Sequence, residues 1–263
     1  MKRILRISVI VIIIIYAVIC IGFFLAQKKL LFHPRVYAQD YKPNIQTPFE
    51  ELYFTMPDGV KLHGLLMKPD SSKGLVFYLH GNAGSVFPRA DQAGPFLKAG
   101  YDFFMPDYRG FGKSGGEIES EEQLYNDVLD IFESMRLRYR DQPIIVYGYS
   151  LGSGLATRIA AVYDVEHVLL LAPYYSIIDV KNSHYPFIPS FLVRYPLRSY
   201  ENYSRIQAPI SIFHGTADNL IPYENSLKLA QINRPDTLIL LEGQGHNGLP
   251  WHDTFLEYVE QNL

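Results

Sequence analysis

Short apolar runs separated by helix-length segments are the feature that most constrains the fold of this chain. Six runs follow one another at a helix-sized spacing: residues 75–79, 101–105, 144–147, 168–171, 210–213 and 238–241. Continuous apolar runs of this length are typical of strands that helices cover on both faces. Helical patterns over residues 121–139, 151–162 and 223–232 supply such helices. The sequence therefore predicts an α/β fold with a mostly parallel central sheet and helices on both faces.

The predicted globular domain covers residues 49–263, a length that one α/β core commonly accommodates. It opens with a hairpin, because alternating apolar residues flank the turn at residues 57–59. The interval 174–205 breaks the strand and helix rhythm, since it is rich in aromatic residues and prolines. We interpret this interval as a short cap over the site.

An uncharged apolar segment at residues 7–26 precedes the domain. Roughly 20 apolar residues in a helix cross the hydrocarbon core of a bilayer, so we predict a single transmembrane anchor. The alternative is a cleaved signal peptide, whose apolar region is usually about 7 to 15 residues long and ends at a small-x-small site. Residues 1–6 form a basic N-terminus, and the proline-containing residues 27–48 are predicted to be an extended linker with little regular structure.

Charges beside the anchor bear on its orientation in the membrane. Basic residues lie on both sides of it, namely Lys2, Arg3, Arg6, Lys28, Lys29 and Arg35. The positive-inside bias is therefore slight, and it favours a cytoplasmic N-terminus. The sequence predicts a single-pass membrane protein with the bilayer as a partner and an extracytoplasmic catalytic domain.

Charge and cysteine content exclude several classes of protein. The net charge of -3 lacks the basic excess of a nucleic-acid binder, so nucleic acid is not an expected partner. The single cysteine, Cys20, can form neither an intrachain disulfide nor a thiolate metal site. We expect no metal and no organic cofactor.

Residues 148–152 read GYSLG, which matches the GxSxG pattern of a nucleophile elbow. A predicted strand ends at this motif and a predicted helix begins at Ser150, so the serine lies on a sharp strand-to-helix turn. Glycines are expected there because larger side chains would collide with the strand and the helix. The alternative is that Ser150 only caps a helix. The context favours Ser150 as a nucleophile.

A serine nucleophile needs a base and an acid, which in this kind of fold follow it in the order Ser, Asp, His. Asp218 follows the run 210–213, and His246 follows the run 238–241. We predict His246 as general base and then general acid, with Asp218 orienting it. Both residues also suit ordinary turns. His214, at a strand end before a glycine, is the closest competitor of His246.

Acyl transfer also needs donors for an oxyanion. The segment HGNAG at residues 80–84 follows the run 75–79, where this kind of fold supplies one donor. We assign the oxyanion hole to the backbone N–H groups of Asn82 and Leu151, with an ordinary glycine turn as the alternative. Asp107 closes another strand but precedes Ser150 in the chain, so we assign it a structural role.

Taken together, these motifs resemble the membrane-anchored, bud-emergence-related subgroup of the α/β-hydrolase superfamily, whose relatives include the ABHD lipid and depalmitoylating hydrolases. The resemblance rests on residues 27–34, HGNAG, DYRGFGKSGG, YGYSLG, HGTAD and GHN, and covers almost the entire chain. Relatives often carry a charged residue where this chain has Tyr149. The resemblance implies cleavage of an acyl ester or thioester, of a small molecule or a lipid.

Three interpretations of function follow. The first is a serine hydrolase that forms an acyl-enzyme and acts on lipid-like esters or thioesters, since aromatic residues gather in the predicted cap. The second is a serine peptidase that uses the same triad, which would be expected to recognise a free amine through an acidic residue in its pocket. The third is a non-catalytic membrane scaffold that retains the fold.

Overall fold

The computed structural model describes residues 2–263, so Met1 of the predicted basic stretch 1–6 lies outside the described residues. An eight-stranded sheet forms the centre of the domain, in the order β10-β9-β8-β7-β4-β6-β3-β2. The strands are β2 (Phe49–Thr55), β3 (Lys61–Met67), β4 (Leu75–Leu79), β6 (Asp102–Pro106), β7 (Ile144–Tyr149), β8 (His167–Leu171), β9 (Ile210–Gly215) and β10 (Thr237–Leu241). Neighbours from β10 to β6 are parallel, while β3 pairs antiparallel with both β6 and β2. The predicted mostly parallel sheet and its N-terminal hairpin are confirmed.

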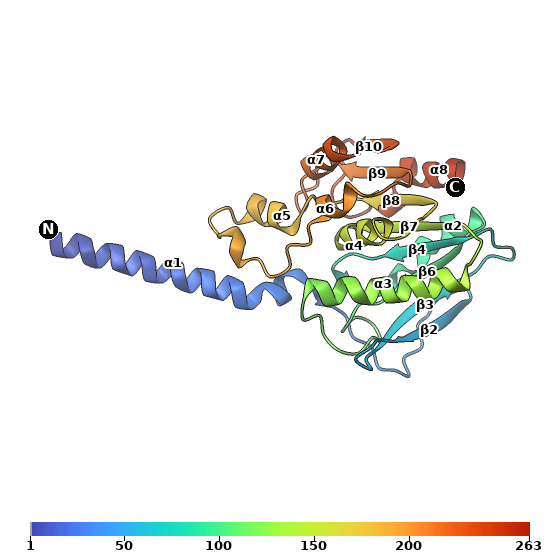
Figure 1. Ribbon diagram of the computed structural model, residues 1–263, viewed down its shortest axis with the longest axis horizontal. Coiled ribbons are helices and arrows are strands. Elements are labelled where there is room, and N and C mark those ends of the chain that lie inside the picture. Colours follow the sequence, from blue (N-terminus) through green and yellow to red (C-terminus); the bar gives the residue numbers. More distant parts are fainter. Residues whose placement is uncertain (1) are drawn as a thin grey trace.

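Helices cover both faces of this sheet (Figure 1). Within the domain they are α2 (Gly94–Lys98), α3 (Glu121–Arg138), α4 (Leu151–Ala160), α5 (Ile177–His184), α6 (Ser199–Tyr203), α7 (Glu224–Ile232) and α8 (Asp253–Asn262). The sheet separates the core into two clusters, and because side chains alternate between the faces of a strand, β4 contributes to both. Leu75, Phe77 and Leu79 belong to the cluster that includes α3 and α4, and Val76 and Tyr78 belong to the one that includes α2 and α8.

The N-terminal helix α1 (Lys2–Leu31) projects from the domain (Figure 1). It is long and apolar enough to cross a membrane, with a mean hydropathy of 3.2 over its most apolar window, none of which is buried. The helix is longer than the predicted anchor at residues 7–26. The expectation of little regular structure in residues 27–48 is therefore wrong for the first residues of that segment, which continue α1, and for the short strand β1 (His33–Pro34).

Tertiary contacts explain why α1 continues past its apolar part. The side chain of Gln27 is buried, donates to the carbonyl of Leu192 at 2.7 Å and accepts from the backbone N–H of Arg194 at 2.7 Å. Beyond the helix, β1 pairs in parallel with β5 (Ala83–Gly84). Polar residues that look like a linker are thus bound to segments distant in the sequence.

The interval predicted as a cap contains α5, a 3-10 turn (Ser190–Leu192) and α6. Figure 1 shows α5 and the adjoining loop beside the domain-proximal part of α1. The hydroxyl of Tyr16, midway along α1, donates to the carbonyl of Phe187 at 2.8 Å. This interval therefore extends along α1 well beyond the point where the helix joins the domain.

Candidate active site

Ser150 lies on a sharp turn between β7 and α4. Its backbone has φ of 54° and ψ of -119°, a region that non-glycine residues rarely adopt. A Cβ on Gly148 would come within 2.5 Å of the carbonyl oxygen of Gly152, and a Cβ on Gly152 within 1.9 Å of that of Leu79. Only glycine fits at either position. The helix begins at Leu151, one residue later than predicted.

The side chain of Ser150 makes no capping hydrogen bond to α4, although the residue occupies the N-cap position. Its Oγ instead lies 3.0 Å from Nε2 of His246, and Nδ1 of His246 lies 2.6 Å from Oδ2 of Asp218. These residues come from loops after β7, β9 and β10, at the carboxyl ends of the strands. The structure thus brings the three predicted site residues together in one hydrogen-bonded chain.

Asp218 is held ionised by its surroundings. Its Oδ1 accepts the backbone N–H groups of Leu220 at 2.9 Å and Ile221 at 2.8 Å. Burial alone would raise the pKa of Asp218, but hydrogen bonds from His214 and His246 outweigh it and hold the pKa well below its ordinary value. The carboxylate is therefore fixed in position and charged.

Sequence reasoning missed the roles of His214 and Tyr149. The ring of His214 is buried, with Nε2 3.3 Å from Oδ2 of Asp218, so it supports the acid. Tyr149 donates its hydroxyl to the carbonyl of His246 at 2.7 Å and stacks on the His246 ring at a centroid distance of 5.5 Å. The one available signal was proximity in the chain, since Tyr149 precedes Ser150 and His214 lies four residues before Asp218.

A small cavity of about 60 Å³ borders Ser150. Asn82 and Leu151, the predicted oxyanion donors, both line it. The loop that carries Asn82 approaches the serine closely, because a Cβ on Gly81 would lie 3.5 Å from the Cβ of Ser150. The structure thus places both predicted residues beside the same cavity as the serine.

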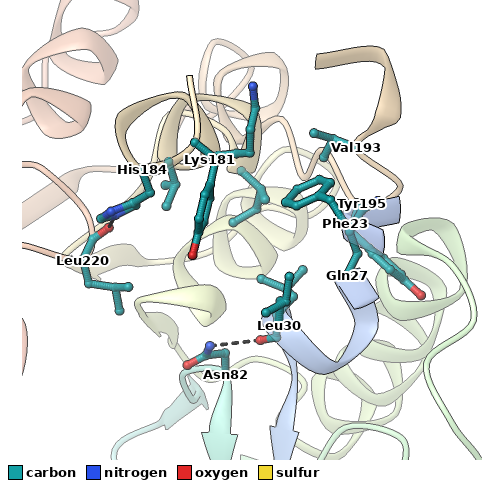
Figure 2. Close-up of a pocket in the computed structure, with 13 residues that line it drawn as sticks. Phe23, Gln27, Leu30, Asn82, Lys181, His184, Val193, Tyr195 and Leu220 are labelled. Carbon is teal, nitrogen blue, oxygen red and sulfur yellow. Dashed lines mark hydrogen bonds between the residues drawn. The ribbon is translucent and has the colours of Figure 1, made fainter. Parts of the chain in front are cut away.

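A larger cavity of about 280 Å³ lies between α1, α5 and the loop that follows α5 (Figure 2). Its lining is mostly apolar: Phe23, Gln27, Leu30, Leu31, Asn82, Ile177, Val180, Lys181, His184, Tyr185, Val193, Tyr195 and Leu220. Asn82 and Leu31 also line the cavity at Ser150. The two cavities are therefore neighbours along one wall.

Asp107 is buried in a separate group of contacts. Its Oδ1 accepts the backbone N–H of Val86 at 3.0 Å, and its Oδ2 lies 3.1 Å from Nδ1 of His63. Burial raises the pKa of Asp107. These partners agree with the structural role assigned to it. Within residues 2–263, no group of three or more His, Cys, Asp or Glu side chains has an arrangement that would hold a metal ion.

Comparisons with known proteins relate the chain to a family of hydrolases. Residues 70–197 match the family described as serine aminopeptidase, S33. The chain is 30% identical over 198 residues to alpha/beta hydrolase domain-containing protein 17B of Xenopus laevis, a match that covers 73% of this chain and 66% of that protein. It is also 30% identical over 186 residues to the lysophosphatidylserine lipase ABHD12 of Macaca fascicularis, covering 63% of this chain and 46% of the lipase. The chain thus spans less than two thirds of either relative.

Solved structures share the fold. An esterase of Pyrococcus furiosus superposes with a TM-score of 0.70 at 19% identity, covering 87% of this chain and 97% of the esterase. A serine hydrolase of Xanthomonas campestris described as lacking a lid superposes with a TM-score of 0.63 at 15% identity, covering 83% of this chain and 95% of that one. The fold, the family match and the relatives support the identification of the chain as an ABHD-like member of the α/β-hydrolase superfamily.

Proposed function

We propose that the chain is a membrane-anchored serine hydrolase that cleaves carboxylic esters or thioesters of lipid-like acyl groups. The observation that carries this proposal is the hydrogen-bonded chain from Ser150 through His246 to Asp218, with the serine in a strained backbone conformation. A helix cap requires neither the strain nor the histidine. A nucleophile elbow accounts for both, because it sets the serine on a strained turn beside its base.

The geometry supports a two-step reaction through an acyl-enzyme. Ser150 Oγ attacks the substrate carbonyl carbon while Nε2 of His246 takes its proton, and His246 then passes that proton to the leaving alcohol or thiol. Water, deprotonated by His246, attacks the acyl-serine, and the serine leaves with the returned proton as the carboxylic acid is released. Asp218 keeps the histidine oriented and stabilises its cation.

The oxyanion that forms in each step needs hydrogen-bond donors on the side of the carbonyl oxygen. We assign this role to the backbone N–H groups of Asn82 and Leu151. Their support is that both residues line the cavity at Ser150, and that Leu151 opens α4, where the first backbone N–H groups have no partner within the helix.

An acyl substrate suits the cavities better than a peptide. No aspartate or glutamate is among the described residues that line the two cavities, and an aminopeptidase needs an acidic group to bind the free amine. The matching family is described as serine aminopeptidase, so a peptidase remains the alternative activity to be tested. The names lysophosphatidylserine lipase and esterase, borne by a relative and a structural neighbour, support ester cleavage.

The test of this proposal uses the full chain in detergent. Its substrates are p-nitrophenyl esters and acyl thioesters of increasing chain length, and aminoacyl p-nitroanilides serve as the peptidase substrates. Wild-type protein is expected to cleave the esters or thioesters, and Ser150→Ala to lose this activity. Ser134→Ala, an exposed serine on α3, is the matched control and should retain it. Cleavage of the anilides alone would favour the peptidase. Folded protein that cleaves none of them would favour the scaffold.

The membrane part of the proposal is a single-pass anchor with the catalytic domain outside the cytoplasm. It is supported by the length and apolarity of α1 and by the slight excess of basic charge at its N-terminus. The proposal predicts that protease digests the domain in cells whose outer layers are permeable to the protease but whose cytoplasmic membrane is intact. Digestion only in inverted membranes would place the domain in the cytoplasm.

A further inference from the structure

The anchor helix is bound directly to the loop proposed to supply an oxyanion donor. The side-chain amide of Asn82 donates to the carbonyl of Leu31 in the last turn of α1, at 2.9 Å. The backbone N–H of His33 donates to the carbonyl of Asn82 at 2.8 Å. The carbonyls at the end of a helix otherwise lack partners, so this contact fixes the end of α1 at the site.

The same helix forms one wall of the larger cavity. Phe23, Gln27 and Leu30 of α1 lie along one side in Figure 2, with Lys181 and His184 of α5 across from them. Five residues line both this cavity and the smaller one at Ser150: Leu31, Asn82, Ile177, Val180 and Leu220. An apolar path therefore leads from the membrane helix to Ser150.

The position of the cap along α1 shows where this path opens. The contact between Tyr16 and Phe187 lies 15 residues before the end of α1, or about 22 Å along a helix. A span of about 20 apolar residues that includes residues 7–26 has Tyr16 inside the hydrocarbon core. The tip of the cap then dips into the bilayer, and its exposed Phe187 (56%) and Phe191 (85%) suit that environment.

We infer that the acyl chain of a membrane-resident substrate enters sideways from the leaflet, between α1 and the cap, and lies against Phe23 and Leu30. The anchor is then part of the acyl-binding site and not only a tether. This inference rests on the proposed function. The occupant is one acyl chain because the cavity of about 280 Å³ is mostly apolar and shares a wall with the cavity at Ser150. Its volume is close to the lower end of the roughly 300–1,000 Å³ typical of small-molecule sites.

The test compares two substitutions in full-length protein reconstituted in phosphatidylcholine nanodiscs. Leu30→Trp enlarges a side chain that lines the cavity, whereas Leu25→Trp adds the same side chain at a position that does not line it. Both leucines are exposed, Leu30 to 52% and Leu25 to 69%, so the two variants differ mainly in their place relative to the cavity. The measured quantity is the ratio of kcat/KM for a palmitoyl ester to that for an acetyl ester. Leu30→Trp should lower the ratio about tenfold, as when roughly two methylenes lose their contacts, and Leu25→Trp should leave it unchanged.

Equal ratios in wild type and Leu30→Trp, or an equal fall in both variants, would overturn the inference while leaving ester hydrolysis intact. No ester hydrolysis by the wild type would instead remove the proposed function, and the inference with it.

A second measurement needs no variant. The probe is a fluorophosphonate with a long alkyl chain that carries a diazirine near the chain end. Ser150 Oγ bonds to phosphorus as fluoride leaves and the hydroxyl proton passes to His246. Light then expels dinitrogen from the diazirine, and the resulting carbene inserts into a bond of a neighbouring residue. Peptide mapping should find the cross-link within residues 23–31 of α1. Cross-links on the domain alone would refute the lateral path. Cross-links between two chains would also overturn it, because they would show a second copy of the chain at the larger cavity.

Discussion

Gly152 offers the sharpest test of how the elbow is built. A Cβ at this position would lie 1.9 Å from the carbonyl oxygen of Leu79 and 2.9 Å from that of His80, and both are backbone atoms. Ordinary contacts begin near 3.4 Å, so Gly152→Ala requires α4 and β4 to separate by about 1.5 Å. Such overpacking typically costs about 1–3 kcal/mol, and the rigid backbone neighbours place this substitution near 3 kcal/mol.

The separation would move Ser150 and Leu151 relative to His246. A misplacement of about 1 Å can lower a rate by about 100-fold. We therefore expect Gly152→Ala to lower ester turnover at least about 100-fold and the apparent melting temperature by about 6 °C or more. Gly94→Ala is the matched control, because a Cβ there meets nothing within 4 Å and its φ of -49° suits alanine. A Gly152→Ala protein with wild-type turnover and melting temperature would refute this reasoning.

The other predictions address the contacts around the triad and one buried ion pair. Asp218→Asn should lower kcat by about 10,000-fold, because His246 loses the partner that selects its tautomer; unchanged kcat would refute the assignment. The lowered pKa of Asp218 contributes stability that is present above about pH 4 and lost as the pH falls through the folded-state value, so the gap in melting temperature between wild type and Asp218→Asn should shrink from pH 6 to pH 3. Tyr149→Phe removes one hydrogen bond to His246 and should cost about 1 kcal/mol in urea unfolding, with a several-fold lower kcat; a change in neither would show that the contact is dispensable. Arg109→Ala leaves the buried Asp127 without its bidentate partner and should destabilise the protein by about 3–5 kcal/mol, with little change in kcat/KM of the folded fraction.

The central sheet and the placement of the site residues were predictable for a local reason. Strands that helices cover on both faces are continuously apolar, so each apolar run predicted one strand. Loops that follow parallel strands meet at one edge of the sheet. Asp218 and His246 follow neighbouring strands and therefore had to lie near each other. The collision that excludes a side chain at Gly152 also follows from a helix starting against a strand.

What the sequence did not predict depends on contacts between distant residues. Gln27 looks like the start of a polar linker, yet its side chain is buried and donates to the carbonyl of Leu192, 165 positions away. Tyr149 meets His246 across 97 positions, and nothing local marks its hydroxyl as a support for the histidine loop. The extent of α1 and its place in the cavity wall follow from the same kind of contact, which no periodic pattern encodes.

The most direct test of the central claim is labelling of the purified protein with a fluorophosphonate, in wild type, Ser150→Ala and His246→Ala. The probe reacts with a serine only when an adjacent base activates it. We predict strong labelling of the wild type and none in Ser150→Ala or His246→Ala, with all three proteins folded. Labelling that persists in Ser150→Ala, or folded wild-type protein that does not label, would contradict the assignment of Ser150 as an activated nucleophile.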